Sequence, residues 1–270
     1  MSTTELPRTP PEPLDEGLAL VVPGRSLPIG AGWHWIAAGW KLFARAPLMW
    51  IISIVVLFVI AIAMNFIPIL GGVVFQLLQG AFAAGFVAAC RSLERGGEFE
   101  LEHLFAGFTR RFGSLLVLGA IVLVGWIVIF LVMATFVGFS IVGAMLTGGT
   151  EAVMEAMLAS VGMLLVGLLV SLLLMFPLLA AYWFAPALVL MHDMAPVDAM
   201  KASFGASMRN ILPFTLYGLV MLVLAIVAII PFGLGMLVWV PLMISSTYAA
   251  YRQIFTGDVA APVPARATMV

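Results

Sequence analysis

Six basic side chains lie within or just after three short amphipathic segments, where they could bind phosphate groups. Each segment places aromatic or aliphatic side chains on one helical face and Lys or Arg on another. Such a segment suits the headgroup layer of a membrane, where basic side chains attract anionic lipids. We expect a cytoplasmic basic-aromatic collar that binds lipid headgroups or a partner protein. Its basic members are Lys41, Arg45, Arg110, Arg111, Lys201 and Arg209.

The same three segments also have a purely structural interpretation. A helix at the membrane surface can set the tilt of the spans that follow it, and this role needs no ligand. The two interpretations are compatible, but only lipid binding predicts that the protein discriminates between lipids.

Three polar side chains within apolar stretches could line a path for a solute. Gln76 and Gln79 are three residues apart and share a helical face, and Tyr217 lies in a later apolar stretch. Hydrogen bonds between helices would satisfy such side chains equally well. The apolar stretches hold no acid or base that could couple solute movement to an ion. The alternative function is therefore a transporter or channel for a small neutral or amphiphilic solute.

The acidic side chains near residue 100 do not have the spacing of a metal site. Glu94, Glu98, Glu100 and Glu102 precede His103, and basic residues lie on both sides of this run. A solvated, ion-paired loop explains this composition without a metal ion. The chain also lacks a nucleotide-binding loop, a nucleophile motif and a zincin motif. We therefore expect no catalytic residue, no metal and no cofactor, and a protein that is not an enzyme.

An internal repeat relates the elements that carry the basic residues. The stretch from Phe99 to Gly119 resembles the stretch from Asp198 to Gly218 at a constant offset, and a fainter copy runs from Trp33 to Trp50. The matched pairs include Phe105 with Phe204, Arg110 with Arg209 and Gly119 with Gly218, and Ala88-Ala89-Cys90-Arg91 recurs as Ala249-Ala250-Tyr251-Arg252.

Asp193 precedes the last amphipathic segment, so we expect its carboxylate to cap that helix.

The composition places these segments in a membrane protein. Hydrophobic residues make up 64% of the 270 residues and charged residues only 9%, whereas soluble domains have about 25% charged residues. A span needs about 20 mostly apolar residues. Six stretches qualify without an interior charge: Leu48–Ile67, Gly72–Cys90, Leu115–Val137, Ser160–Ala185, Ile211–Ile230 and Gly233–Tyr251.

The predicted fold is an all-α bundle of six transmembrane helices within residues 31–255. Short turns join the first span to the second and the fifth to the sixth, which favours antiparallel hairpins. We expect three hairpin units, each preceded by an amphipathic helix. Their approximate ranges are 31–92, 99–192 and 196–255.

The basic residues also predict an orientation. All 12 Lys and Arg residues fall outside the three hairpin turns, so the positive-inside rule places their side of the bundle in the cytoplasm. Both termini of this multi-pass protein are then cytoplasmic. The N-terminus does not resemble a signal peptide. Residues 1–30 are expected to form a disordered or extended tail, and residues 256–270 a disordered C-terminal tail.

Charge also limits the expected partners. A net charge of -1 and the lack of a basic block argue against nucleic acid. Membrane lipids are the expected partners, with a partner protein or a second copy of this chain as further candidates.

Three phrases of the sequence resemble an uncharacterised family of bacterial six-span membrane proteins. They are GWHWIAAGWKLFARAP, LEHLFAGFTRRFG and FAPALVLMHDMAPVDAMKASFGASMRNILPFTLYG, and the resemblance covers about residues 22–255. That family has no established function, so the resemblance implies a fold and a place in the bacterial inner (plasma) membrane, and no active residues. The hairpin-plus-amphipathic-helix plan is also remotely similar to the membrane domain fused to some glycerophosphodiester phosphodiesterases. This chain has no such catalytic domain, so the similarity implies no hydrolase activity.

Overall fold

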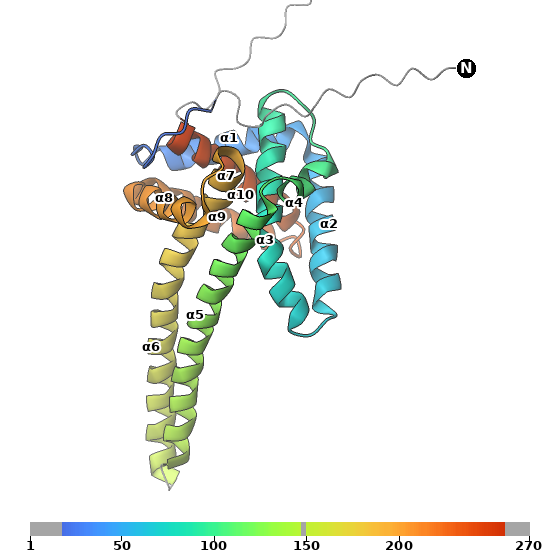
Figure 1. Ribbon diagram of the computed structural model, residues 1–270. Helices are drawn as coiled ribbons and strands as arrows, with labels where there is room; N and C mark the ends of the chain where they lie inside the picture. Colours follow the sequence, from blue (N-terminus) through green and yellow to red (C-terminus); the bar gives the residue numbers. More distant parts are fainter. Residues whose placement is uncertain (1–17, 147–149, 257–270) are drawn as a thin grey trace, which may run out of the picture.

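Most of the residues that the structure describes are helical. The computed structural model describes residues 18–146 and 150–256 (Figure 1). The remaining residues of both predicted tails lie outside the described residues, and so does the centre of the predicted loop between the third and fourth spans. The helices are α1 (Ala31–Arg45), α2 (Pro47–Asn65), α3 (Leu70–Glu94), η1 (Leu101–Phe105), α4 (Ala106–Thr109), α5 (Phe112–Leu146), α6 (Thr150–Tyr182), α7 (Ala185–His192), α8 (Pro196–Arg209), α9 (Ile211–Ile229), α10 (Met236–Tyr251) and η2 (Arg252–Thr256).

Within the described residues, five helical stretches are long and apolar enough to cross a membrane. They agree with the first five predicted spans to within a few residues at most of their ends, and the fourth continues through α7. This confirms an all-helical protein with several membrane spans. The stretches are Pro47–Asn65, Leu70–Glu94, Phe112–Phe139, Val161–His192 and Ile211–Ile229.

The sixth predicted span is not confirmed. Its residues form α10, which has only 16 residues and is therefore about 24 Å long, shorter than the roughly 30 Å hydrocarbon core of a bilayer. The preceding turn uses the missing residues, because Phe232 and Gly233 have positive φ angles of 53° and 80°. The turn continues to Gly235, the N-cap residue of α10, so α10 begins at Met236.

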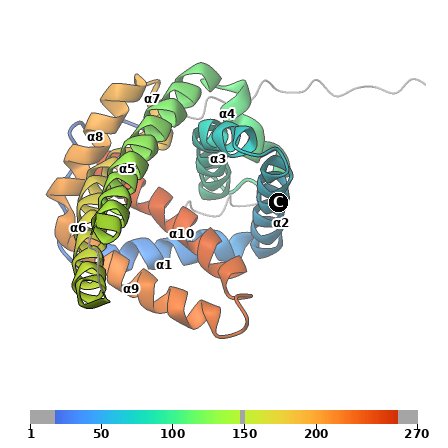
Figure 2. The same ribbon diagram turned by 90° about the horizontal axis from the view of Figure 1, so that it is seen from below.

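The third predicted hairpin, α9 and α10, runs in a different direction from the first, α2 and α3. Figure 1 shows α5 and α6 as a long pair that extends beyond the shorter pair α2 and α3. In Figure 2, α2 and α3 are seen nearly end-on, whereas α1, α9 and α10 run across the view. The predicted set of three equivalent hairpins is therefore not confirmed, and the internal repeat stays a prediction.

Close backbone contacts explain why α9 and α10 lie along α1. A Cβ atom added to Gly39 of α1 would lie 2.6 Å from the backbone N of Ser246 in α10, and one added to Gly32 would lie 2.4 Å from the carbonyl O of Pro213 in α9. Small residues let membrane helices approach this closely. The hydroxyl of Ser245 also donates a hydrogen bond to the Gly39 carbonyl O at 3.0 Å. α1 is therefore packed against the third hairpin rather than lying free on a membrane surface.

Two of the three predicted amphipathic segments form single helices, and the second does not. α1 and α8 cover the first and third segments. The second is divided into η1 and the one-turn α4, after which Arg111 has a positive φ of 58°. Contact with α3 accounts for the division, because a Cβ atom on Gly107 would lie 2.2 Å from the carbonyl O of Ala81. This segment follows the surface of α3 instead of continuing as a regular helix.

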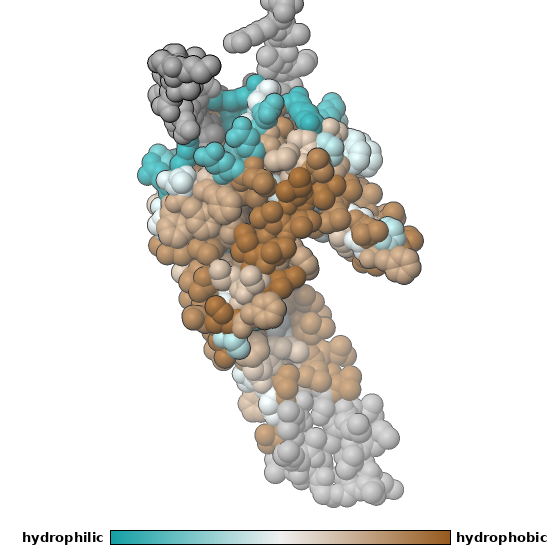
Figure 3. Space-filling model, turned by 90° about the vertical axis from the view of Figure 1, so that its right-hand side faces the viewer, coloured by the Kyte–Doolittle hydropathy of each residue, from teal (hydrophilic) through white to brown (hydrophobic). Residues whose placement is uncertain are grey.

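Hydrophilic residues gather at one end of the molecule. Figure 3 shows a teal surface at this end and a mostly brown surface over the rest of the coloured part of this face. We call it the polar end, and it comprises α1, the C-terminal end of α3, η1, α4, α7, α8 and η2 (Figure 1). Away from it, large apolar side chains are exposed, such as Phe130 of α5 at 71% and Leu173 of α6 at 72%. Burial in lipid is the natural environment for such a surface.

The described part of the predicted N-terminal tail, residues 18–30, is largely extended and bound to the polar end. The backbone N–H of Val21 donates a hydrogen bond to the carbonyl O of Phe255 in η2 at 2.7 Å. The buried Asn210, between α8 and α9, accepts a hydrogen bond at Oδ1 from the Leu27 N–H at 2.8 Å. Backbone hydrogen bonds therefore hold this segment in place.

Candidate functional site

A cavity of about 580 Å³ lies at the polar end, between α3 and the η1–α4 segment. We call it the arginine pocket, because three arginine residues line it. Arg91, Ser92 and Arg95 come from α3 and its C-cap position. Glu100, Glu102, His103, Thr109 and Arg110 are the polar residues on the facing wall.

The ends of two helices bring the three arginines together. Arg91 and Arg95 are four residues apart, so they share one face at the C-terminal end of α3. Carbonyl groups at a helix C-terminus carry partial negative charge, which favours cations there. Arg110 directly follows α4 and is extended, with φ of −118° and ψ of 123°. The break in the second amphipathic segment thus places Arg110 beside the end of α3.

Two glycines set the distance between the walls of the arginine pocket. A Cβ atom on Gly85 of α3 would lie 2.3 Å from the carbonyl O of Leu104, and the corresponding atom on Gly107 of α4 would meet the backbone of α3. Leu104 is only 1% exposed, so its side chain is buried where η1 contacts α3. The η1–α4 segment therefore lies at backbone distance from α3.

Phenylalanine side chains continue from the arginine pocket onto the apolar surface. Phe105 lines the pocket and is 43% exposed. The ring of Phe82 on α3 lies 6.3 Å from that of Phe105 and 5.0 Å from that of Phe108 between centroids. Phe108 in turn stacks on Phe112 of α5 at 5.5 Å. The phenylalanine rings therefore connect the arginine pocket with the apolar surface of the protein.

A buried ionic cluster supports the α3 side of the arginine pocket. The carboxylate of Glu94 accepts hydrogen bonds from Nη1 of Arg91 and Nε of Arg252, each at 2.9 Å, and from the hydroxyl of Tyr248 at 2.6 Å. The side chains of Arg91 and Arg252 are only 7% and 9% exposed. Glu94 is 13% exposed, so its predicted place in a solvated loop is wrong. The cluster joins the C-terminal ends of α3 and α10.

Three predicted collar residues have partners within the protein. Arg45 donates a hydrogen bond through Nη1 to the carbonyl O of Leu93, near the end of α3. Arg111 forms a salt bridge with Asp193. Lys201 lies 3.6 Å from Asp198, and both side chains are largely exposed. Arg45 and Arg111 therefore connect elements of the polar end.

Asp193 does not cap α8, contrary to the prediction. It ends α7 in the left-handed conformation, and the N-cap residue of α8 is Ala195, which makes no side-chain cap. A left-handed residue followed by the extended Ala195 reverses the chain between these two helices. The Asp193 carboxylate is thereby directed to Arg111 instead.

The remaining collar residues lie at separate places. Lys41 on α1 and Arg209 at the end of α8 are exposed, whereas Arg110 lines the arginine pocket. The six residues do not form one continuous site. The sequence did not identify Arg91 and Arg95 as site residues, because both lie beside the acidic run and were expected to form ion pairs with it. Their four-residue spacing at a helix C-terminus was the available signal.

His103 has a local structural partner rather than a metal-like environment. Its Nδ1 accepts a hydrogen bond from the backbone N–H of Glu100 at 3.0 Å, which closes the first turn of η1. Across residues 18–146 and 150–256, no three His, Cys, Asp or Glu side chains are placed to hold a metal ion.

The predicted polar path is not assembled. Nε2 of Gln76 donates a hydrogen bond to Oε1 of Gln79 at 3.0 Å, so the two amides contact each other within α3. Tyr217 instead bonds Ser246 of α10 at 2.9 Å. It lines a different cavity, of about 590 Å³, which includes neither glutamine.

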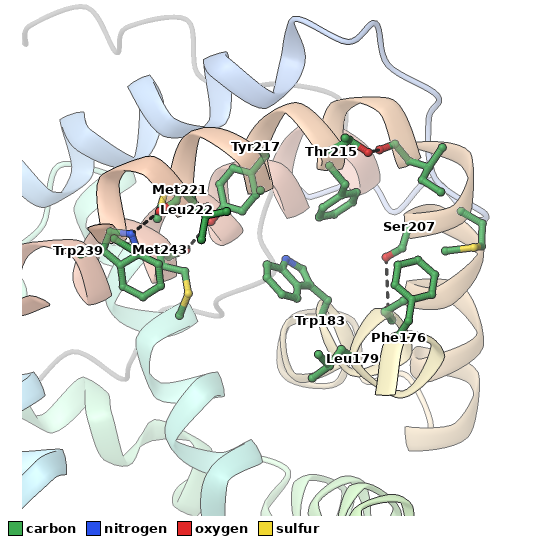
Figure 4. A pocket seen from close by; sticks show the side chains of 16 residues that line it. Phe176, Leu179, Trp183, Ser207, Thr215, Tyr217, Met221, Leu222, Trp239 and Met243 are labelled. Carbon is green, nitrogen blue, oxygen red and sulfur yellow. Dashed lines mark hydrogen bonds between the residues drawn. The ribbon is translucent and has the colours of Figure 1, made fainter. Parts of the chain in front are cut away.

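That second cavity is almost entirely apolar. Figure 4 shows the Trp183 indole projecting between Tyr217 on α9 and Leu179 on α6. The Trp183 and Tyr217 rings lie 6.5 Å apart between centroids. Met243 of α10 also lines the cavity. The cavity suits an apolar chain better than a hydrated solute.

The apolar helices and the polar end define a multi-pass helical membrane protein. No protein-family model matches the chain, and no solved structure matches it. Over 211 residues the chain is 31% identical to a probable inner membrane protein of Burkholderia thailandensis, a match that covers 76% of this chain and 77% of that protein. This chain therefore belongs to the same family of inner membrane proteins. The prediction of a multi-pass inner membrane protein is confirmed, whereas the orientation of the termini and the remote phosphodiesterase similarity stay predictions.

Proposed function

We propose that this protein is a non-enzymatic inner-membrane protein whose polar end binds phospholipid headgroups from the cytoplasmic side. The arginine pocket is the observation that carries the proposal. Guanidinium groups bind phosphate oxygens with paired, charge-assisted hydrogen bonds. Arg91, Arg95 and Arg110 line one cavity of about 580 Å³, a volume within the range of small-ligand sites, and the partly exposed Phe105 leads from it to the apolar surface.

The exposed basic residues extend this role around the polar end. Lys41, Lys201 and Arg209 lie on α1 and α8, outside the arginine pocket. Near an anionic membrane surface, each such charge contributes about 1 kcal/mol of attraction. We propose that they form the collar that holds the polar end against the cytoplasmic leaflet, with the positive-inside rule supporting the orientation. A protein partner or a second copy of the chain is the other candidate for this collar.

The proposal predicts that two arginines of the pocket are needed for stabilisation by lipid. A ligand that binds only the folded state stabilises it by about 2.7 kcal/mol at a hundredfold excess over its Kd. We expect added short-chain phospholipid to raise the unfolding midpoint of the detergent-solubilised protein, and the double substitution Arg95→Gln and Arg110→Gln to remove more than half of that rise. The buried Cys90, the single cysteine of the chain, supplies the measurement through reaction with a thiol-reactive fluorophore on unfolding.

The matched control removes two positive charges outside the pocket. Lys201→Gln with Arg209→Gln is expected to leave most of the lipid-dependent rise in place. An equal loss in both double variants would contradict a site at the arginine pocket and favour a diffuse electrostatic effect.

A second candidate function is transport of a small neutral or amphiphilic solute. The cavity beside Tyr217 favours an amphiphile, because its lining is apolar and the polar Gln76–Gln79 pair lies elsewhere. Gly218 lines this cavity, and a Cβ atom there would meet nothing within 4 Å. If the protein transports such a solute, Gly218→Leu should slow flux of a fluorescent amphiphile in proteoliposomes, whereas a pure lipid-binding role predicts no protein-dependent flux.

A further inference from the structure

We infer that the arginine pocket selects a phospholipid whose headgroup carries a primary ammonium group beside the phosphate, as in phosphatidylethanolamine. The inference rests on the proposed headgroup binding and adds the charge pattern of the ligand. It follows from the two signs of charge in the pocket lining.

The arginine pocket has carboxylates as well as guanidinium groups. Arg91 and Arg95 lie on the α3 wall, while Glu100 and Glu102 lie on the η1 wall. A purely anionic headgroup would gain from the arginines and be repelled by the carboxylates. A zwitterionic headgroup places opposite charges against both walls, and such complementarity discriminates between ligands.

Glu102 is the better placed of the two carboxylates to accept the ammonium group. Glu100 is the N-cap residue of η1, where its carboxylate accepts a hydrogen bond from the His103 backbone N–H and its own backbone N–H donates to the His103 ring, so a change there would disturb the wall itself. Glu102 lies in the first turn of η1 and is exposed. A primary ammonium donates three hydrogen bonds, which a carboxylate on the pocket wall can accept. The phosphate is then left to Arg95 and Arg110.

Phenylalanine rings at the edge of the arginine pocket favour a lipid as the ligand over a soluble phosphate ester. Phe105 is 43% exposed at the pocket, and Phe112 at the start of α5 is 37% exposed. The ring of Phe108 lies between them, 6.0 Å from that of Phe105 and 5.5 Å from that of Phe112. A lipid with its headgroup in the pocket can lay an acyl chain on these rings, whereas soluble glycerophosphoethanolamine gains nothing from them.

Native mass spectrometry of the delipidated full-length protein in detergent tests this selectivity. The probes are dioctanoyl phosphatidylethanolamine and dioctanoyl phosphatidylglycerol, with soluble glycerophosphoethanolamine as a competitor. We expect the protein to bind one ethanolamine lipid about fivefold more tightly than the glycerol lipid, because one charge-assisted hydrogen bond is at stake. Glu102→Gln should abolish this ratio, while Glu98→Gln, on the same loop but outside the pocket, should keep it. The soluble competitor should not displace the bound lipid at an equal concentration.

The outcomes separate this inference from the proposed function. Equal binding of both lipids by the unsubstituted protein, or an unchanged ratio in Glu102→Gln, would overturn the ammonium selectivity. If Arg95→Gln with Arg110→Gln still lowered the binding of both lipids in that case, headgroup binding would stand. If the double arginine substitution changed neither lipid, the proposed function itself would fail. Displacement by the soluble competitor would overturn the lipid source of the headgroup.

Discussion

Replacing Glu94 with alanine is expected to lower the free energy of unfolding by about 3–5 kcal/mol, because removal of one partner from a buried ion pair is strongly destabilising. Its carboxylate lies between the guanidinium groups of Arg91 and Arg252 and also accepts a hydrogen bond from Tyr248. Without it, two positive charges that are 7% and 9% exposed face each other across the ends of α3 and α10. The exposure of Cys90, one turn away on α3, measures the loss by thiol labelling against temperature or denaturant.

A surface carboxylate provides the matched control for Glu94. Asp198 lies 3.6 Å from Lys201, and both are more than half exposed. Because exposed ion pairs contribute little, Asp198→Ala should shift the unfolding midpoint far less than Glu94→Ala. Glu94→Gln should fall between the two alanine variants, since an amide can accept a hydrogen bond but carries no charge. Equal midpoints for Glu94→Ala and Asp198→Ala would show that the cluster does not stabilise the fold.

Adding one methyl group at Gly39 is expected to destabilise the protein by about 1–3 kcal/mol, the usual cost of overpacking a core. The new Cβ of Gly39→Ala would lie 2.6 Å from the backbone N and 2.8 Å from the Cα of Ser246. Backbone atoms cannot move aside as a side-chain end can, so α1 must separate from α10. The same change should weaken the hydrogen bond from Ser245 to the Gly39 carbonyl O.

Gly205 tests whether the effect belongs to the contact or to any glycine in a helix. It lies inside α8, and a Cβ atom there would meet nothing within 4 Å. Gly205→Ala should be neutral or stabilising by up to about 1 kcal/mol, because alanine has the higher helix propensity. If Gly39→Ala were as stable as Gly205→Ala, the close packing of α1 on α10 would be contradicted. Thiol labelling of Cys90 serves both variants.

The sequence predicted the helices well because their signals are local. Apolar runs of span length, with glycine and proline at their ends, are sufficient to place α2, α3 and α9 to within a few residues. The direction of the third hairpin depends on contacts between residues far apart in the chain, such as Gly39 with Ser246. No local pattern contains that information, so three equivalent hairpins were the simplest expectation.

The candidate site was predicted in part for the same reason. Arg110 was recognised from its place after an amphipathic segment, and it does line the arginine pocket. Arg45 has the matching place in the first amphipathic segment, yet it donates a hydrogen bond to the Leu93 carbonyl O of another helix. The division of the second segment also arises from tertiary contact, through Gly107 and Ala81. Basic residues next to an apolar stretch therefore indicate the membrane surface. Which group each of them contacts can be known only from the folded structure.

The central claim is that the arginine pocket holds a phospholipid in the native membrane. Native mass spectrometry of the protein gently released from its own membranes tests this most directly, because it reports subunit number and retained lipid together. We predict one retained phospholipid per chain, lost from the Arg95→Gln and Arg110→Gln double variant and kept in the Lys201→Gln and Arg209→Gln double variant. A chain released without lipid, or one that retains the same lipid in both double variants, would contradict the account.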